Sequence, residues 1–341
     1  SIELIKRIGT IVPEVMDLLE RRYLMLRTIA FRQPIGRRAL SAELDISERT
    51  ARTELDILRK LELLNSDNMG MYVTDSGLEL LEDLGEIYKS LKGIPKLTQK
   101  LSEVLGVRDI LIVPGNSSED SIVLKDMGRA AAERLKKSIK GKDIVGVTGG
   151  STMAVVADAI SSSERFPEAT IIPARGGLGT DIYTQSNSIA AKIGQALGAG
   201  YKLLYIPDSL GEEALKLALG NEEIKESLNL INNMRVLLFG IGRADTMAKR
   251  RSLPEKKHSE LLQQKAVAEA FGHYFDIEGN DIWEYKTVGL SLGIYKKVEE
   301  VIGVAGGEEK AEAIIAVSSI RKDISLVVDE AVANKIIQLM N

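Results

Sequence analysis

Apolar residues in the first 92 positions recur every three or four residues, the period of an amphipathic helix. They form three consecutive groups: Tyr23, Leu26 and Ile29; Leu40 and Leu44; and Ala51, Leu55 and Leu58. Pro34 and Gly36 end the first group, and the Ser47 hydroxyl is placed to cap the third helix. The pattern predicts three helices, with a turn at Asp45-Ile46 between the last two.

Turn and strand patterns follow these helices. The stretch "LLNSDNMGMYVT" (63–74) predicts two short strands around Asp67–Gly70, and "TDSG" (74–77) starts a capped helix. This order is typical of a winged helix-turn-helix, whose third helix offers its N-terminal polar residues to the DNA major groove. We expect phosphate contacts from Arg37 and Arg38. The expected contacts from the third helix and its cap are Ser47, Arg49, Thr50, Arg52 and Thr53.

The charge distribution agrees with a polyanionic partner for this part of the chain. Residues 21–60 hold ten Lys and Arg against five acidic residues, a local charge of +5 in a chain whose net charge is −4. The competing interpretation is a plain helical bundle whose arginines form a solvated face. DNA binding is favoured because the turn, the cap, the hairpin and the basic bias agree.

Beyond residue 92 the pattern changes to short apolar runs that end in glycine, proline or an acidic residue and alternate with helical segments. The runs are "DILIVPG" (109–115), "DIVGVTGG" (143–150), "ATIIPARGG" (169–177), "YKLLYIP" (201–207), "VLLFGIG" (236–242), "VIGVAGG" (301–307) and "ISLVVDE" (324–330). Such runs predict a Rossmann-like α/β domain with a parallel sheet covered on both faces. The chain therefore divides into residues 1–92 and 93–341.

Composition narrows the chemistry. The chain of 341 residues has no cysteine and only two histidines, which argues against disulfides, thiol nucleophiles, metal sites and a Ser-His-Asp triad. The N-terminus carries charges too often for a signal peptide, and no apolar run approaches the ~18 residues of a membrane span. We expect a cytoplasmic protein that binds no membrane and needs no cofactor.

Several strand-to-helix loops of the second domain favour an anion. "VTGGST" (147–152), "FGIGRADTM" (239–247) and "VAGGEEKAEA" (304–313) each place glycines before a helix N-terminus, where free amides attract negative charge. Ser151 and Thr152 add hydroxyl groups, Lys310 adds a cation, and Arg175, Arg250 and Arg251 supply planar donors. One such loop alone is more often a tight turn. Together they predict a ligand with two phosphates.

The alternatives to a sensed sugar phosphate are a dinucleotide and a catalysed substrate. A dinucleotide fits poorly because no loop has the full G-x-G-x-x-G pattern or the acidic residue that follows it. Acid–base candidates exist, namely Asp181, Asp245, Glu269, His273, Lys310 and Asp329, but none is a nucleophile with an evident partner. Sensing needs fewer assumptions than catalysis, so we expect no catalytic residues. A sugar-phosphate isomerase or deaminase with an appended DNA-binding domain remains the alternative.

The strings "VTGGST", "PARGGLG", "GIGRADTMAKRR", "AVAEAFGHYF" and "VAGGEEKAEAI", behind a winged helix, resemble the SorC/DeoR-type bacterial transcription regulators. Within that family, the chain is most similar to the branch that controls central glycolytic genes in low-GC Gram-positive bacteria. The resemblance covers nearly the whole chain. It implies a repressor of a glycolytic operon that acts as a homo-oligomer, a dimer or tetramer, on double-stranded operator DNA.

The resemblance also implies a sugar-phosphate isomerase-type fold for residues 93–341, which would serve effector binding and oligomerisation. The effector it implies is fructose 1,6-bisphosphate, which releases the repressor from DNA. The residues it implies as effector contacts are Gly149, Gly150, Ser151, Thr152 and Lys310 for one phosphate, Arg175, Arg250 and Arg251 for the other end, and Gln185 and Glu269 for phosphate or hydroxyl groups.

Overall fold

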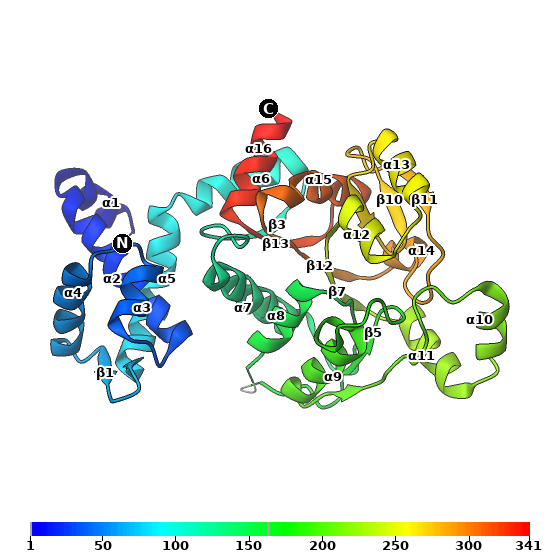
Figure 1. Ribbon diagram of the computed structural model, residues 1–341, viewed down its shortest axis with the longest axis horizontal. Helices are drawn as coiled ribbons and strands as arrows, with labels where there is room; N and C mark the ends of the chain where they lie inside the picture. The colour runs from blue at the N-terminus through cyan, green and yellow to red at the C-terminus, as the bar shows by residue number, and fades with distance from the viewer. Residues whose placement is uncertain (1, 162–163) are drawn as a thin grey trace. The chain divides into compact units, whose positions relative to one another are not determined.

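The chain forms two compact units, one ending at Pro95 and one running from Lys96 to Asn341. The computed structural model describes residues 2–161 and 164–341 (Figure 1). Across those ranges no helix combines the length and the apolar character that a membrane crossing requires.

The first unit is a winged helix. Its described elements are, in chain order, α1 (Ile2–Ile11), α2 (Pro13–Arg32), α3 (Arg37–Glu43), α4 (Glu48–Lys60), β1 (Leu64–Ser66), β2 (Met71–Val73) and α5 (Asp75–Leu91), followed by α6 (Ile94–Leu105), which runs into the second unit. The predicted caps are confirmed, because Ser47 Oγ accepts from Thr50 N at 3.0 Å and Thr74 Oγ1 from Gly77 N at 3.1 Å. The predicted hairpin is confirmed as well, since β1 and β2 pair antiparallel.

Apolar spacing explains how this unit packs. Ala51, Leu55 and Leu58 lie on one face of α4, and each is 1% exposed or less. Leu55 and Leu58 pack with residues of α2 and the hairpin in one hydrophobic cluster, which includes Met25 and Leu26. The opposite face of α4 is therefore left to polar residues.

The second unit is built on a seven-stranded parallel sheet of order β3-β13-β12-β7-β4-β5-β6, which confirms the predicted α/β fold. Its first described elements after α6 are β3 (Asp109–Val113), α7 (Ser121–Ser138), β4 (Ile144–Val147), α8 (Ser151–Ala159), β5 (Thr170–Pro173), η1 (Ile182–Thr184), α9 (Ser186–Leu197), β6 (Gly200–Tyr201), α10 (Glu212–Ala218), α11 (Glu222–Asn232) and β7 (Val236–Gly240). The later ones are α14 (Leu292–Tyr295), β12 (Glu300–Val304), η2 (Glu308–Lys310), α15 (Ala311–Ile320), β13 (Ser325–Asp329) and α16 (Glu330–Met340).

Helices cover both faces of this sheet. Helices α7, α8 and α9 share one hydrophobic cluster with the strands, and α15 and α16 lie on the other side (Figure 1). After β4 the chain adds β5 and β6 on one side of the sheet, and after β7 it adds β12 and β13 on the other side. The direction in which strands are added therefore reverses between the neighbouring strands β4 and β7. In open α/β sheets a ligand binds beyond the carboxyl ends of the strands at such a reversal.

The run "YKLLYIP" only partly forms the predicted strand. β6 covers Gly200–Tyr201, and the chain then leaves the sheet. Leu204 N donates to Asn187 Oδ1 at 2.9 Å, and Asn187 Nδ2 donates to the Leu204 carbonyl at 3.0 Å. The Asn187 side chain thus makes the hydrogen bonds that a neighbouring strand would otherwise make. The segment continues to Asp208 at the carboxyl edge of the sheet.

An unpredicted antiparallel sheet of order β11-β10-β9-β8 interrupts the alternation of strands and helices after β7. Its segment contains β8 (Gly242–Arg243), α12 (Ala244–Arg250), α13 (Glu255–Gln263), β9 (Ala268–Ala270), β10 (His273–Phe275) and β11 (Asp281–Glu284). The strands are two to four residues long, too short for a clear alternating pattern in the sequence. This sheet forms one wall of the site described below.

We expect Leu55→Ala to lower the free energy of unfolding of the first unit by about 2–5 kcal/mol, because the truncation leaves a cavity in its core. Trp283, the one tryptophan of the sequence, lies in the second unit, so its fluorescence reports unfolding there, whereas far-UV circular dichroism reports both units. In urea, the part of the dichroism change that reports the first unit should occur at a lower urea concentration, while the midpoint of the fluorescence change stays the same. The control is Leu61→Ala at a position 56% exposed, and equal shifts for the two variants would contradict the packing.

Candidate functional site

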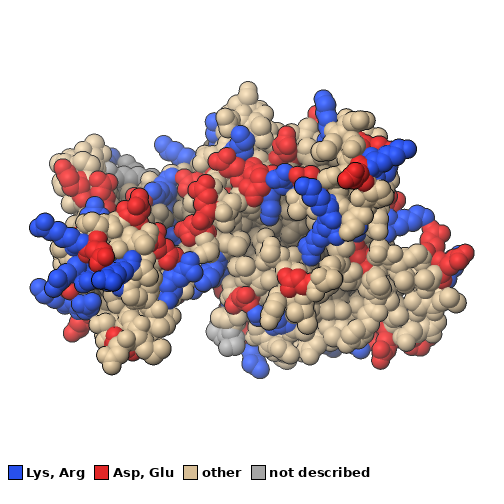
Figure 2. Space-filling view, viewed as in Figure 1, with Lys and Arg blue, Asp and Glu red and all other residues tan. Residues whose placement is uncertain are grey.

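The predicted DNA contacts lie on exposed surface around the N-terminal half of α4. Arg37, Arg38, Arg49, Arg52 and Thr53 are exposed, and Figure 2 shows Lys and Arg side chains gathered over this part of the molecule, at its left edge. Arg37 and Arg38 lie loosely beside Glu48, at 3.8 and 3.7 Å, which leaves both guanidinium groups accessible to phosphates.

The other two predicted contacts serve the helix start. The hydroxyls of Ser47 and Thr50 lie 2.8 Å apart, and Ser47 also holds the Thr50 amide. This arrangement fixes the beginning of α4 and so the direction in which its arginines project.

Two arginines of the basic segment turn inward. Arg22 Nε donates to Glu54 Oε2 at 2.7 Å, and Arg21 lies 3.8 Å from the same carboxylate. Glu54 belongs to α4 and is buried, so the pair ties the recognition helix to α2. The local positive charge that faces DNA is therefore smaller than the residue count suggests.

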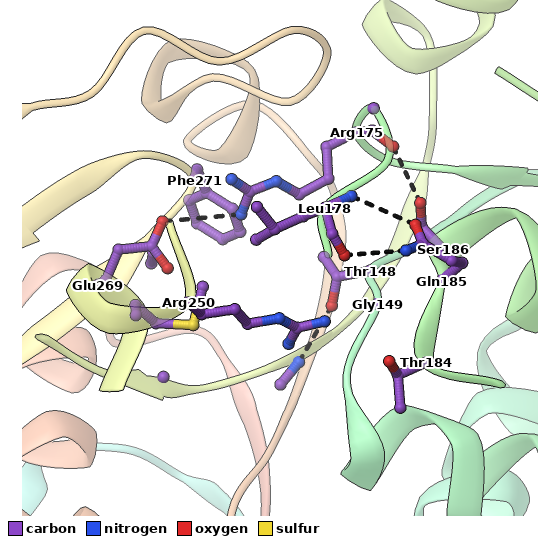
Figure 3. Close-up of a pocket in the computed structure, with 15 residues that line it drawn as sticks. Thr148, Gly149, Arg175, Leu178, Thr184, Gln185, Ser186, Arg250, Glu269 and Phe271 are labelled. Carbon is purple, nitrogen blue, oxygen red and sulfur yellow. Dashed lines mark hydrogen bonds and ion pairs between the residues drawn. The ribbon is translucent and has the colours of Figure 1, made fainter. Parts of the chain in front are cut away.

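The second unit contains a pocket at the carboxyl ends of β4, β5 and β7, where the strand order reverses. It encloses about 550 Å³ including its open mouth, and one wall comes from the turn between β9 and β10. Its lining residues are Thr148, Gly149, Arg175, Gly176, Leu178, Thr184, Gln185, Ser186, Gly240, Gly242, Met247, Arg250, Glu269, Ala270 and Phe271 (Figure 3).

The loop between β4 and α8 needs its two glycines. A Cβ on Gly149 would lie 2.6 Å from the Thr184 carbonyl oxygen, and Gly150 has φ of +124°, which side chains rarely adopt. No side chain caps α8, whose first residues are Ser151 and Thr152. The helix N-terminus therefore keeps its attraction for an anion beside the pocket.

Behind the pocket lies a buried network of four charges. Arg175 donates from Nε and Nη2 to the two carboxylate oxygens of Asp208, at 3.1 and 2.9 Å. Arg251 donates to Asp208 Oδ2 at 2.6 Å and to Glu269 Oε1 at 3.1 Å. Glu269 Oε1 also accepts from Gly272 N and lies 3.7 Å from Arg175 Nη1. The network joins β5, the segment after β6, α12 and β9.

This network corrects the expected role of Arg251. Its side chain is fully buried and lies outside the pocket lining, because Asp208 and Glu269 hold it beneath the site. Arg175 does line the pocket, but the paired donors of its guanidinium already face Asp208. Sequence reasoning missed Asp208, although an acidic residue directly after the run "YKLLYIP" was a usable signal.

Arg250 is the cation that remains available to a ligand. No hydrogen bond or ion pair joins its guanidinium to any residue that the structure describes, and its side chain extends across the pocket toward Thr148 and Gly149 (Figure 3). Burial lowers the pKa of Arg250, and the neighbouring charges of Arg175 and Arg251 lower it further. An anion placed here would relieve that repulsion.

Gln185 closes the loop that forms the opposite rim. Its Nε2 donates to the carbonyl oxygens of Leu178 and Gly179 at 3.0 and 2.8 Å, and its Oε1 accepts from Leu178 N at 3.2 Å. Gln185 and Glu269 thus line the pocket while both are bonded within the protein.

The third glycine loop differs from the other two. Its cradle already holds an internal anion, because Asp329 Oδ2 accepts from Gly307 N and Ser117 N, each at 2.8 Å. Lys310 has no hydrogen bond or ion pair to the described residues, and burial lowers its pKa. The pocket lining includes neither Lys310 nor Gly150, Ser151 and Thr152.

The acid–base candidates do not gather in the pocket. Asp181 caps η1, Asp245 pairs with Arg243, and His273 pairs with Asp281. Of the six candidates only Glu269 lines the pocket, where Arg251 and Gly272 N already bind it. The arrangement is suited to binding an anion and offers no paired acid and base.

The fold defines a winged-helix unit joined to a separate α/β unit that has a pocket at its strand ends. Residues 18–88 match the family described as "CggR N-terminal DNA binding domain", and residues 89–338 match the Sugar-bind family, described as "Putative sugar-binding domain". The chain is 38% identical over 336 residues to the central glycolytic genes regulator of Bacillus subtilis, a match that covers 98% of this chain and 99% of that protein.

Solved structures agree with these matches. A chain from Enterococcus faecalis assigned to the SorC family of transcriptional regulators is 34% identical, with a TM-score of 0.66 over 71% of this chain and 99% of that one. The full-length sorbitol operon regulator SorC of Klebsiella pneumoniae is 18% identical, with a TM-score of 0.63 over 94% of this chain and 99% of that one, and shows the shared fold.

The chain belongs to the SorC-type transcription regulators that carry the Sugar-bind domain, as the sequence motifs predicted. The proteins it matches are regulators and not enzymes, which decides against the isomerase or deaminase alternative.

We expect Asp208→Ala to lower the free energy of unfolding of the second unit by about 3–5 kcal/mol, because two buried guanidinium groups lose their shared partner. Urea unfolding followed by Trp283 fluorescence measures the change. Glu222→Ala removes the 85% exposed carboxylate beside Lys225 and should shift stability by less than about 0.5 kcal/mol. A loss no larger for Asp208→Ala would mean that the network does not stabilise this unit.

Proposed function

We propose that this protein is a cytoplasmic repressor of a glycolytic operon and that fructose 1,6-bisphosphate releases it from operator DNA. The observation that carries the proposal is the Arg250 guanidinium, which has no hydrogen bond or ion pair to the described residues and extends across a pocket of the sugar-binding domain toward Gly149, just before the uncapped start of α8. A ligand with an anionic group at each end suits both features. The name of the Bacillus subtilis relative supports the glycolytic assignment.

In the proposed complex one phosphate lies at the start of α8, where Gly149, Gly150, Ser151 and Thr152 offer amides and hydroxyls and Lys310 offers charge. Arg250 and Arg175 meet the other phosphate. Glu269 accepts hydrogen bonds from sugar hydroxyls, and the Gln185 amide donates or accepts them. Both side chains exchange part of their present bonds within the protein for these contacts. Arg251 does not contact the ligand in this complex. It holds Asp208 and Glu269 in position by hydrogen bonds.

In the proposed mechanism α4 reads the operator while a homo-oligomer, a dimer or tetramer, presents two such helices to paired half-sites. The effector must bind one arrangement of the oligomer more tightly than the other, with a coupling free energy of about 1–3 kcal/mol. Gel shifts with the DNA upstream of the gene test release. An unchanged shift across millimolar fructose 1,6-bisphosphate would remove the induction claim.

Arg250→Ala should weaken fructose 1,6-bisphosphate binding about tenfold to a hundredfold, because it removes a charge-assisted hydrogen bond worth roughly 1.5–3 kcal/mol. Operator affinity without effector should stay the same. Calorimetry measures the first quantity and gel shifts the second. The control is the exposed neighbour Lys249→Ala, which should respond like the original protein, and parallel losses in both variants would count against the site.

Arg38→Ala should weaken binding to any duplex and reduce the slope of log K against log salt by about 1, because one phosphate contact is lost. Arg49→Ala should instead relax the preference for operator over random DNA by about 1–3 kcal/mol. Fluorescence anisotropy at several salt concentrations measures both. Lys89→Ala on α5 serves as the control, and identical behaviour of the two arginine variants would overturn their assigned roles.

A further inference from the structure

The turn between β9 and β10 places an unsuitable residue in a demanding backbone position. Ala270 pairs with His273, so Phe271 and Gly272 form a two-residue turn, and their φ angles are +59° and +87°. Turns of this kind with two positive φ angles favour Asn-Gly or Asp-Gly. A bulky aromatic residue there costs free energy that the surrounding structure must supply.

Neighbouring groups hold this turn in place. A Cβ on Gly272 would lie 2.3 Å from the Tyr285 carbonyl oxygen, so only glycine fits. Gly272 N donates to Glu269 Oε1 at 2.8 Å, and Tyr285 N donates to the Gly272 carbonyl at 2.7 Å. The turn that carries Phe271 is therefore tied to the buried charge network through Glu269.

Phe271 is 4% exposed, so its ring packs mainly in the core and only a small part of it faces the pocket. Beneath it lie the rings of Phe239 and Tyr295, with centroids 5.2 and 4.7 Å away. It also lines the pocket beside Leu178, between Glu269 and Arg175, with Arg250 on the other side of the ring (Figure 3). The middle of a strongly charged site is thus an apolar wall made by Phe271 and Leu178.

We propose that this wall is the specificity determinant of the pocket, selecting phosphorylated compounds with a carbon skeleton over inorganic anions of similar charge. The inference rests on the proposed function and concerns the carbon skeleton of the ligand, which the cations do not recognise. Arginine and helix amides can bind a phosphate group of pyrophosphate as well as one of a sugar bisphosphate. Only the latter brings C–H surface to cover Phe271 and Leu178 and so gains from apolar burial.

Titration calorimetry of the full chain with fructose 1,6-bisphosphate and with pyrophosphate tests the inference. Phe271→Asn removes the ring and supplies a residue that the turn favours. It should weaken sugar bisphosphate binding about tenfold or more and leave pyrophosphate binding within twofold. Leu178→Ala should act in the same direction. This variant keeps the backbone bonds to Gln185 and leaves the aromatic core intact, so it tests the wall even if Phe271→Asn unfolds.

The outcomes separate the two claims. If both ligands lose affinity equally in Leu178→Ala and in folded Phe271→Asn, or if neither ligand does, the wall does not set specificity. If the original protein binds pyrophosphate as tightly as the sugar bisphosphate, the inference fails while the anion site stands. If the original protein binds neither ligand, the proposed function itself fails. Leu217→Ala, at a position 83% exposed on α10, is the matched leucine control and should change neither affinity.

Discussion

The pocket of the second unit depends on the ion pairs that the buried carboxylate of Asp208 makes with two arginines. Fully buried, this carboxylate accepts from Arg175 at the end of β5 and from Arg251 at the end of α12, two segments that are 76 positions apart in the sequence. Two guanidinium groups side by side would repel each other without it. The small antiparallel sheet reaches the main sheet through the same network, because Glu269 of β9 also binds Arg251. Asp208 thus connects two walls of the pocket directly, and Glu269 connects the third through Arg251.

The same network explains why the pocket suits recognition better than catalysis. Each acidic group near the ligand position is already bound: Glu269 by Arg251 and Gly272 N, and Asp208 by two arginines. A general base needs a carboxylate that is free to contact the substrate, and these two already accept hydrogen bonds from protein donors. Arg250, in contrast, has no such partner among the described residues. A pocket with engaged acids and an available cation suits the binding of an anion better than its chemical conversion.

The two units use arginine in different ways. Arg37, Arg38, Arg49 and Arg52 of α3 and α4 are exposed, and Arg37 and Arg38 lie only loosely beside Glu48, which suits a partner that approaches as an extended phosphate backbone. In the second unit Arg175 and Arg251 are buried and are oriented by Asp208, which suits one small ligand of defined shape. Arg21 and Arg22 are exceptions in the first unit, because both pair with the buried carboxylate of Glu54 and serve the packing of α2 against α4.

The sequence by itself determined the elements and most of the motifs, because helix period, caps, glycine turns and apolar strand runs act over a few residues. Ser47 and Thr74 cap helices as predicted, and all seven apolar runs contribute strands of one parallel sheet, although the run after β5 does so only at its start. Which cation faces the ligand was decided by the tertiary structure. Arg250 and Arg251 are adjacent in sequence, yet one crosses the pocket and the other is buried beneath it. Ion pairing between distant segments makes that choice, and no local pattern encodes where Asp208 meets its partners.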